Sequence, residues 1–421
     1  MREWIEKPLN QLVTFQKGRK VDTSSFCKDG YSAYLGASGI EGREDGYGDP
    51  RFGVIAKPSD TLMLWDGERS GLVGFGQHGV VASTVSKLSP NESVDPQFLY
   101  FSLLAKFDWI QHRRTGTGVP HVPKDLGRVL KIRLPKQKAT QAKIAAILST
   151  IDTAIEQTEA LIEKCQHIKA GLMHDLFTRG VLPSGQLRPP REQAPELYQE
   201  TAIGWIPREW RLSKAGDHCS LITKGTTPAS SDMWESSEGI RFLRVDNLTF
   251  DGRFDLTASS YRISDMTHTM ALSRSKCVPG DVLMNIVGPP LGKVSLVTAE
   301  VGEVNINQAI ALFRPTASLS SIYLLRWLLS TGAKRWLIQR AKQTSGQLNL
   351  TLAMCQKLEI PLPNIEEQGL MEMRLQAAER LTQSEMIRLK ELQTKKLGLM
   401  QDLLTGRVPV TLDVPEPQAE V

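Results

Sequence analysis

The sequence predicts an α+β protein in which two tandem mixed α/β domains are each followed by a long helix. Two observations lead to this fold class. The chain carries two copies of one sequence plan, and each copy ends in a stretch of about forty residues without proline. We expect the two long helices to pair as an antiparallel coiled coil, with pseudo-twofold symmetry between the copies.

Composition sets broad limits on the class of protein. A chain of 421 residues, with 41% hydrophobic and 23% charged residues, is typical of two or three globular domains. The formal net charge of +5 permits nucleic-acid binding without demanding it. Five widely spaced cysteines without a Cys-x-x-Cys pair argue against a disulfide framework and against a zinc site. With no apolar signal core and no membrane-spanning run, we expect a cytoplasmic protein.

Residues 1–136 form the first predicted domain. Short β-rich runs, such as Asp60–Trp65 and Gly79–Val85, alternate there with glycine-rich turns. Pro96–His112 then has helical spacing and is followed by a Thr-Gly turn at 115–118. This irregular texture predicts a mixed α/β domain.

Residues 137–180 form the predicted central helical region. Ile144, Ile151, Cys165 and Leu172 share a seven-residue frame that only Thr158 interrupts, so the helix spanning 138–179 has a narrow apolar seam. Such a seam requires a partner helix. The same segment taken alone would suit a long helix of an all-α domain equally well.

A linker at 181–200, rich in Pro and Gly, precedes the second copy. The second domain is predicted at 201–364, a second helical region at 365–406 and a disordered tail at 407–421. The run PGDVLM at 279–284 parallels PSDTLM at 58–63, and GLMQDLLT from Gly398 parallels GLMHDLFT from Gly171 at an offset of 227. In the second seam Glu385 interrupts the apolar frame, which indicates either solvent or contact with another protein.

At these residues the sequence resembles the specificity subunit of type I restriction-modification systems. The resemblance covers nearly the whole chain. It is carried by Gly204-Trp-Ile-Pro207 followed by Trp210, by Val278-Pro-Gly-Asp281-Val-Leu283, by Gly346-Gln-Leu-Asn349-Leu350, by Ile360-Pro-Leu-Pro363 with Glu367-Gln368, and by the Leu-Met-x-Asp-Leu helix ends. The first copy departs from the pattern, because Trp4 lacks a preceding Gly-x-Ile-Pro segment and His121 stands where the second copy has Asn349.

The resemblance implies two target recognition domains, each reading one half of a split, asymmetric DNA site, with the helices between them as a spacer. It implies two modification subunits as partners, which bind S-adenosylmethionine and methylate adenine. It also implies restriction subunits that use ATP, where the system includes them.

We find no residues that predict chemistry by the chain itself. The segment Gly288-Pro-Pro-Leu-Gly292-Lys293-Val294 is one residue too short for a phosphate-binding loop and lacks the Ser or Thr that holds magnesium. The chain has no Asn-Pro-Pro-aromatic motif, and its seven histidines have no metal-ligand spacing. No catalytic residue, cofactor or metal site is therefore predicted.

Basic residues recur at matching places in the two copies, which suggests a face that contacts DNA phosphates. The alternative is a solvated charged surface. The predicted phosphate contacts are Lys17, Arg19, Lys20, Arg113 and Arg114 in the first copy, and Lys224, Arg335 and Arg340, near Lys334 and Lys342, in the second.

Base reading requires side chains that present paired donors and acceptors, so Asn, Gln and Arg on loops are the candidates. They are Arg69 and Gln77 in the first copy and Asn305, Asn307, Gln308, Gln343 and Gln347 in the second. Ordinary polar surface loops are the alternative for each of them.

Together these features predict a DNA-recognition subunit without catalytic activity, whose partners are double-stranded DNA and modification subunits. One alternative is a protein-interaction scaffold with two binding domains on a coiled-coil rod. Another is a methyltransferase or nuclease in its own right.

Overall fold

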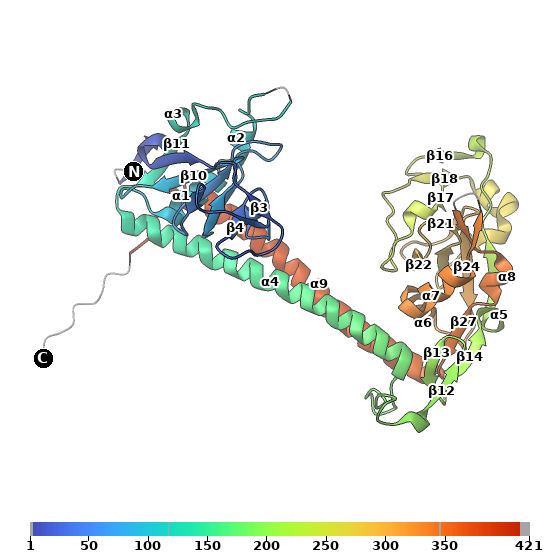
Figure 1. Cartoon of the computed structure of the whole chain (residues 1–421). Helices are drawn as coiled ribbons and strands as arrows, with labels where there is room; N and C mark the ends of the chain where they lie inside the picture. Colours follow the sequence, from blue (N-terminus) through green and yellow to red (C-terminus); the bar gives the residue numbers. More distant parts are fainter. Residues whose placement is uncertain (1–2, 117, 345–346, 413–421) are drawn as a thin grey trace, which may run out of the picture. The chain divides into compact units, whose positions relative to one another are not determined.

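The computed structural model describes residues 3–116, 118–344 and 347–412, and the chain folds into two compact units (Figure 1). The first unit combines Met1–Leu161 with Glu385–Val421, and the second spans Ile162–Ser384. Both long helices are therefore divided between the units. The domain limits expected above stay predictions, and residues 413–421 of the expected disordered tail lie outside the described residues.

The described part of the first unit holds three sheets, ordered β1-β11, β2-β10-β7-β8 and β3-β5-β4-β9-β6. The pair β4 and β9 is parallel and the other pairs are antiparallel. The elements are β1 (Trp4–Pro8), β2 (Val13–Lys17), β3 (Thr23–Ser24), β4 (Ser32–Leu35), β5 (Tyr47–Gly48), β6 (Val54–Ala56), β7 (Thr61–Leu64), β8 (Val73–Phe75), β9 (Gly79–Val81), β10 (Val85–Pro90), β11 (Lys131–Pro135), α1 (Pro96–Leu104), α2 (Phe107–Gln111) and α3 (Leu126–Val129).

The second unit repeats this plan as β14-β27, β15-β24-β20-β22 and β16-β18-β17-β23-β19, again with one parallel pair, β17 and β23. It adds the hairpin β12-β13 and the small sheet β21-β26-β25. The elements are β12 (Tyr198–Thr201), β13 (Gly204–Pro207), β14 (Arg211–Lys214), β15 (Cys219–Lys224), β16 (Met233–Glu235), β17 (Ile240–Leu243), β18 (Tyr261–Ile263), β19 (Lys276–Cys277), β20 (Val282–Asn285), β21 (Val287–Gly288), β22 (Val294–Leu296), β23 (Val304–Ile306), β24 (Ile310–Pro315), β25 (Lys342–Thr344), β26 (Gln347–Asn349), β27 (Glu359–Leu362), α5 (Ala215–His218), α6 (Ser321–Leu329), α7 (Thr331–Arg340) and α8 (Leu352–Gln356).

Each four-stranded sheet is buried on both faces, which explains the uninterrupted apolar residues at 62–65 and 282–284. On β7, Met63 packs into one core with α1, whereas Leu62 and Leu64 pack into a second core against β6 and β9. On β20, Leu283 likewise faces one core while Val282 and Met284 face another. Successive side chains along each of these strands therefore point to opposite faces of the sheet and pack into two different cores. The matching strand orders confirm the predicted class of two tandem mixed domains, each followed by a long helix.

The stretch Pro96–His112, which has helical spacing, is broken into two helices, and so is its counterpart in the second unit. Ala105 and Lys106 separate α1 from α2. Ser330 separates α6 from α7, and its hydroxyl accepts a hydrogen bond from the backbone N–H of Ala333 at 3.3 Å. A Ser that caps a new helix favours such a break, because its side chain replaces a missing backbone acceptor.

The long helices are α4 (Lys138–Arg179) and α9 (Ile365–Leu403). In the first unit Lys396 forms a 2.6 Å ion pair with Asp152, and in the second Lys169 forms a 2.6 Å ion pair with Glu379. Residue 169 lies 17 positions after residue 152 on α4, whereas its partner 379 lies 17 positions before 396 on α9. The helices therefore pair antiparallel, as predicted (Figure 1).

The seam residues behave as their frame predicts. Ile144, Ile151 and Cys165 are buried, and Thr158 is buried with its hydroxyl donating to the backbone oxygen of Ala154 at 2.7 Å. A Thr is tolerated at such a position because this bond satisfies its hydroxyl. Glu385, which interrupts the second seam, has one carboxylate oxygen buried without a hydrogen-bond partner among the described residues.

A glutamine near the start of each long helix ties it to the preceding domain. Gln141 is fully buried, accepts from the N–H of Asp95 at 2.7 Å and donates to the carbonyl oxygen of Pro135 at 2.8 Å. Gln368 is also fully buried, accepts from the N–H of Ser320 at 2.8 Å and donates to the carbonyl oxygen of Pro363 at 3.1 Å. Asp95 and Ser320 are the N-caps of α1 and α6, so each glutamine fixes the long helix against a short one.

A glycine just beyond each long helix lies against a tryptophan. Gly180 and Gly406 have positive φ values of 66° and 69°, as is common at the C′ position of a helix. A Cβ atom on Gly180 would lie 2.4 Å from the Trp210 ring, and one on Gly406 would lie 2.6 Å from the Trp4 ring. The repeated helix ends of the sequence therefore serve as docking points for these rings.

The segment 181–200, expected as a linker, is anchored by a buried ion pair. Arg188 and Glu367 have side chains that are only 4% and 7% exposed, with Nη2 of Arg188 3.1 Å from the Glu367 carboxylate. Glu367 also accepts from the Trp210 indole at 3.1 Å and from the N–H of Val181 at 2.8 Å. Burial alone would lower the pKa of Arg188, but the hydrogen bonds and charges of Glu367 and Glu209 outweigh burial and raise it.

Candidate nucleic-acid interface

A cluster around Asp66 joins two distant loops of the first unit. The Asp66 carboxylate lies 2.8 Å from Nζ of Lys17, at the end of β2, and 2.7 Å from Nδ1 of His121. The N–H of Gly67 also donates to the carbonyl oxygen of Pro120 at 2.8 Å. Burial of Asp66 would raise the pKa of its carboxyl, but the bonds to Lys17 and His121 lower it below its usual range. The loop that ends at 121 is thereby held beside Lys17.

The second unit builds the equivalent corner with backbone pairing. The strand β21 pairs with β26, placing Val287 opposite Asn349. This corresponds to the bridge between Asp66 and His121 in the first unit. His121 and Asn349 therefore occupy matching positions in the two units, as their alignment in the repeat predicts, although their side chains differ.

Each unit also has a glycine at the end of its first long strand, next to a lysine. A Cβ atom on Gly18 would lie 2.1 Å from the carbonyl oxygen of Ala82, and one on Gly225 would lie 1.8 Å from that of Ile306. Only glycine permits such close passage of two backbones. Lys17 and Lys224 precede these glycines and are exposed, as are Arg19 and Lys20 in the following loop.

The paired arginines of the first unit differ in their freedom. Arg114 donates through Nε to the carbonyl oxygen of Gln111 at 3.0 Å and through its terminal nitrogen to that of Glu68. The exposed Arg113 instead packs its guanidinium over the Trp109 ring, 3.9 Å from the centroid. Arg113 is thus the more available of the two for a phosphate, whereas Arg114 mainly positions its loop.

Two predicted base readers of the first unit lie near Glu41 and Gly42. Arg69 places both terminal nitrogens on the Glu41 carboxylate, at 3.1 and 3.0 Å, which occupies much of its donor fork. Gln77 is half-buried, and its side-chain oxygen is buried without a hydrogen-bond partner among the described residues. Gln77 stays a predicted base contact through the part of its side chain that remains exposed.

Among the predicted readers of the second unit, Asn305 must be corrected. Its side chain is fully buried, with the amide oxygen bonded to Nδ1 of the buried His268 and the amide nitrogen donating to the carbonyl oxygen of Leu272 at 3.0 Å. A side chain committed to such bonds in the core does not reach DNA. The strand period places its neighbours Val304 and Ile306 together in one apolar core on the other face, so Asn305 is a structural residue.

Asn307 and Gln308 follow β23 at a more accessible place. Gln308 is exposed and accepts a hydrogen bond from the Thr227 hydroxyl, and Asn307 is half-buried with an unpartnered side-chain oxygen in the described structure. Both remain predicted base contacts, near Lys224 and Gly225. Gln343 and Gln347 have side chains outside the described residues, although their backbones belong to β25 and β26.

The basic residues of α7 lie in two different environments. Arg340 lies 3.9 Å from Glu359 and 5.9 Å from the Trp336 ring centroid, at the end of α7 that leads to β25. Lys334 and Arg335 instead line an apolar pocket beside α4. Arg335 is exposed and stays a predicted DNA contact, with this pocket as its immediate setting.

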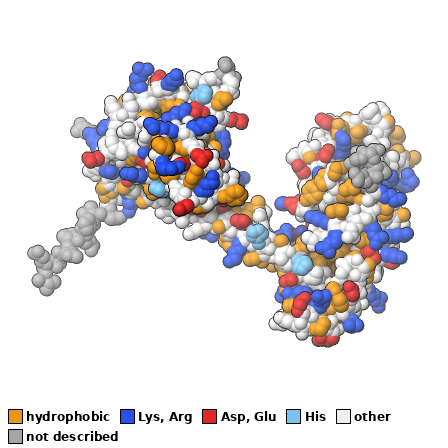
Figure 2. All heavy atoms as spheres, viewed as in Figure 1, with side chains coloured by type: hydrophobic (Ala, Val, Ile, Leu, Met, Phe, Trp, Pro, Cys, Tyr) orange, Lys and Arg blue, Asp and Glu red, His pale blue; other side chains and the backbone are white. Residues whose placement is uncertain are grey.

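On the face of the first unit seen in Figure 2, Lys and Arg side chains are spread over much of the surface, with Asp and Glu side chains between them. In the described part of the chain, no group of three or more His, Cys, Asp or Glu side chains is placed to hold a metal ion. Among the described helices, none combines the length and apolar character that crossing a membrane requires.

The family of the chain follows from its match to known proteins. Residues 1–166 and 207–394 match the model of the type I restriction modification DNA specificity domain. The chain belongs to this family. The two matched segments each contain one copy of the repeated fold, so the family model and the strand orders identify the same duplication.

Known members of the family agree with this assignment. The chain is 28% identical to the type I restriction enzyme MjaVIII specificity subunit of Methanocaldococcus jannaschii, over 85% of this chain and 81% of that one. The crystal structure of a type I restriction-modification S subunit from M. genitalium matches with a TM-score of 0.59 and 16% identity, over 95% of this chain and 96% of that one. A chain from a structural study of complex assembly and conformational transition in a type I R-M system also matches with a TM-score of 0.59, at 18% identity over 96% of this chain and 98% of that one. These structural matches share the fold of the specificity chain.

Sequence reasoning named Lys17 and His121 but missed Asp66, and with it the ion pairs that join the three residues. Lys17, Asp66 and His121 are far apart in sequence and carry no common motif. The one available signal was the repeat itself, since His121 stands at the position of Asn349 and such alignment marks residues that share a structural place.

Proposed function

We propose that this chain is the DNA sequence-recognition subunit of a type I restriction-modification complex, without catalytic activity of its own. Each repeated domain binds one half of a bipartite site. The observation that carries the proposal is the repeated corner, in which an exposed lysine, Lys17 or Lys224, precedes a glycine that lets a second loop approach closely. Equivalent cations on equivalent loops suit two equivalent segments of duplex DNA.

Phosphate and base contacts divide between different residues. The exposed Lys17, Arg19, Lys20 and Arg113 of the first unit, and Lys224 and Arg340 of the second, provide long cationic side chains for phosphates. Gln77, Asn307 and Gln308 provide amides for base edges, and the exposure of Gln308 supports this role.

The partners are modification subunits, two in the simplest form of the complex, with restriction subunits where the system contains them. Apolar side chains on the long helices remain open to solvent, including Ile168 at 55%, Leu381 at 52% and Leu397 at 69% exposure. Exposed apolar residues at this density along helices are typical of faces covered in an assembly. We place the contacts of the modification subunits on these faces.

The test is methylome sequencing of a host that carries this chain with its modification subunit. We expect one bipartite motif whose two halves are methylated together, and salt-dependent binding of the purified complex to that motif. The competing function, a scaffold that binds proteins through its two domains, predicts no sequence-dependent DNA binding. That result would reject our proposal.

A further inference from the structure

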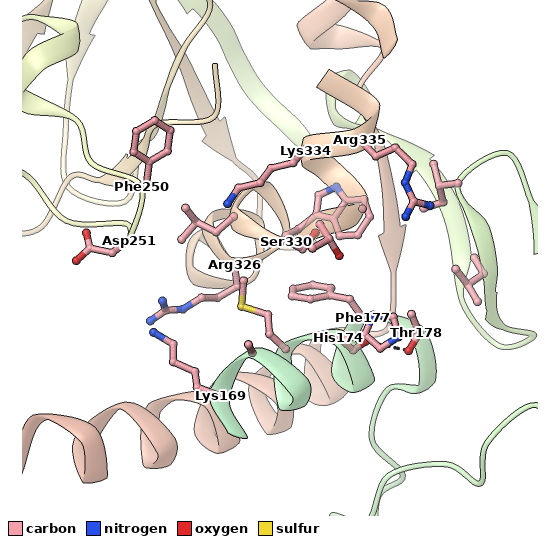
Figure 3. A pocket seen from close by; sticks show the side chains of 18 of the residues that line it. Lys169, His174, Phe177, Thr178, Phe250, Asp251, Arg326, Ser330, Lys334 and Arg335 are labelled. Carbon is pink, nitrogen blue, oxygen red and sulfur yellow. Dashed lines mark hydrogen bonds between the residues drawn. The ribbon is translucent and has the colours of Figure 1, made fainter. Parts of the chain in front are cut away.

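The second unit contains a pocket of about 460 Å³ that the proposed DNA-binding function does not use (Figure 3). Its walls come from the last four turns of α4, the hairpin β12-β13, the loop at 250–251 and the junction of α6 with α7. This volume lies in the range of pockets that hold small organic ligands, which is roughly 300–1,000 Å³.

Two buried aromatic rings form the floor of the pocket. Phe177 and Trp327 are 5% and 3% exposed, with ring centroids 5.5 Å apart. Two further rings, Trp205 and Phe250, stand on the walls and are 40% and 46% exposed. Half-exposed aromatic walls above a buried aromatic floor favour a flat apolar ligand.

The rim of the pocket carries an excess of positive charge. Lys169 and Arg326 lie side by side and share a single carboxylate, that of Glu379, at 2.6 and 2.5 Å. Lys334, which reaches over the pocket toward Phe250 in Figure 3, forms no ion pair with a described residue. Asp251, the acidic group on the wall, is itself neutralised by Arg253 at 2.6 Å.

Two details strengthen the attraction for an anion. The Nε–H of Arg326 is buried without an acceptor in the described structure, so no hydrogen bond offsets its partial positive charge. A cation also lies over each of the two wall rings. Arg191 is 4.7 Å from the ring centroid of Trp205, and Lys293 is 5.9 Å from that of Phe250. Both contacts raise the local positive potential.

The corresponding hollow of the first unit lacks these features. It has a similar volume of about 450 Å³ and lies between the last turns of α9 and the end of α1, but no aromatic ring lines it. The fold therefore repeats the hollow, whereas the aromatic walls belong to the second unit alone among the described residues. A feature that the repeat does not require points to a function of its own.

We propose that this pocket binds a small aromatic anion, with the rings holding its flat body and Lys334 and Arg326 holding its charge. Aromatic carboxylates and nucleoside monophosphates share this chemistry. The inference does not depend on DNA recognition, because ligand binding to the pocket is measured without DNA, although Arg335, a predicted DNA contact, also lines it.

The test uses the full-length chain and two fluorescent probes, 8-anilinonaphthalene-1-sulfonate and its uncharged counterpart N-phenyl-1-naphthylamine. We expect one saturable sulfonate site per chain. Phe250→Ala weakens binding of both probes, whereas Lys334→Ala weakens the sulfonate by about tenfold and leaves the neutral probe unchanged. Competition with AMP and with indole-3-acetate separates phosphate from carboxylate ligands.

Lys106→Ala and Leu397→Ala, in the hollow of the first unit, are the matched controls and should leave both probes unaffected. Thermal unfolding of every variant checks that the fold is retained. The proposal would be overturned if Lys334→Ala bound the sulfonate as tightly as the unmodified chain, or if neither competitor displaced the probe.

Discussion

At the scale of single residues, burial decides whether a polar side chain serves the fold or the ligand. Asn305 and Gln308 are both amides of the segment Asn-Ile-Asn-Gln, and both were predicted to read bases. Asn305 is fully buried and bonded to His268 and Leu272, whereas Gln308 is exposed. Their substitutions should therefore have different consequences.

We predict that Asn305→Ala lowers the free energy of unfolding by about 2 kcal/mol, because it leaves buried hydrogen-bonding groups without partners. Gln308→Ala should leave stability nearly unchanged and weaken binding to the cognate DNA relative to unrelated DNA. Urea unfolding and DNA titration of the two variants check this. Equal stability of both variants would show that the Asn305 bonds contribute little.

The buried ion pair of Arg188 and Glu367 is the other decisive feature at this scale. We predict that Glu367→Gln destabilises the chain by about 3 kcal/mol, because a buried guanidinium loses its main counter-charge. Glu192→Gln serves as the control, since its pair with Arg191 is 3.7 Å long and mostly exposed. An exposed pair of this kind contributes less than about 1 kcal/mol. A similar loss in both variants would contradict the structural role of Glu367.

At the scale of elements, each long helix is defined by its pattern but positioned by one glutamine. Gln141 bonds to the N-cap residue of α1 and to the end of β11, and Gln368 makes the same kind of bonds to α6 and β27. The two glutamines thus join three elements in each unit. The equivalence of the bonds in both units supports a shared positioning role.

We predict that Gln141→Leu lowers the free energy of unfolding by about 2–4 kcal/mol. Leucine has a similar volume, but it leaves one N–H and two carbonyl groups without their hydrogen-bond partner. Gln137→Leu, at an exposed position just before the helix, is the control and should change stability by less than about 0.5 kcal/mol. Chemical unfolding followed by circular dichroism measures both. A neutral Gln141→Leu would mean that apolar packing alone holds the helix in place.

At the scale of the whole molecule, duplication makes function testable one half at a time. Lys17 and Lys224 precede equivalent glycines, so each should contact the phosphates of a different half-site. We predict that replacing either by Ala lowers DNA affinity and reduces the salt slope of log K by roughly one charge. The effect of each should persist when the half-site read by the other domain is scrambled. If one substitution abolished recognition of both half-sites, this assignment would be contradicted.

The long helices belong to the same scale, because we propose that they set the gap between the half-sites. A heptad is about 10 Å of helix, which equals roughly three base pairs. Inserting one heptad in α4 with a matching heptad in α9 should lengthen the tolerated gap by about that amount. Methylome sequencing measures the gap directly. An unchanged gap would reject the spacer role while leaving DNA recognition intact.

The sequence by itself determined the duplication, the α+β class and the two long helices, including the observed bounds of the first at 138–179. These features are local or repeated, so periodicity and internal alignment reveal them. Only the tertiary structure decided that Asn305 is buried, that Arg69 bonds to Glu41 and that Asp66 joins Lys17 to His121. Such partners lie 28 to 55 residues apart, and no local pattern of side chains specifies which of them the folded chain brings into contact.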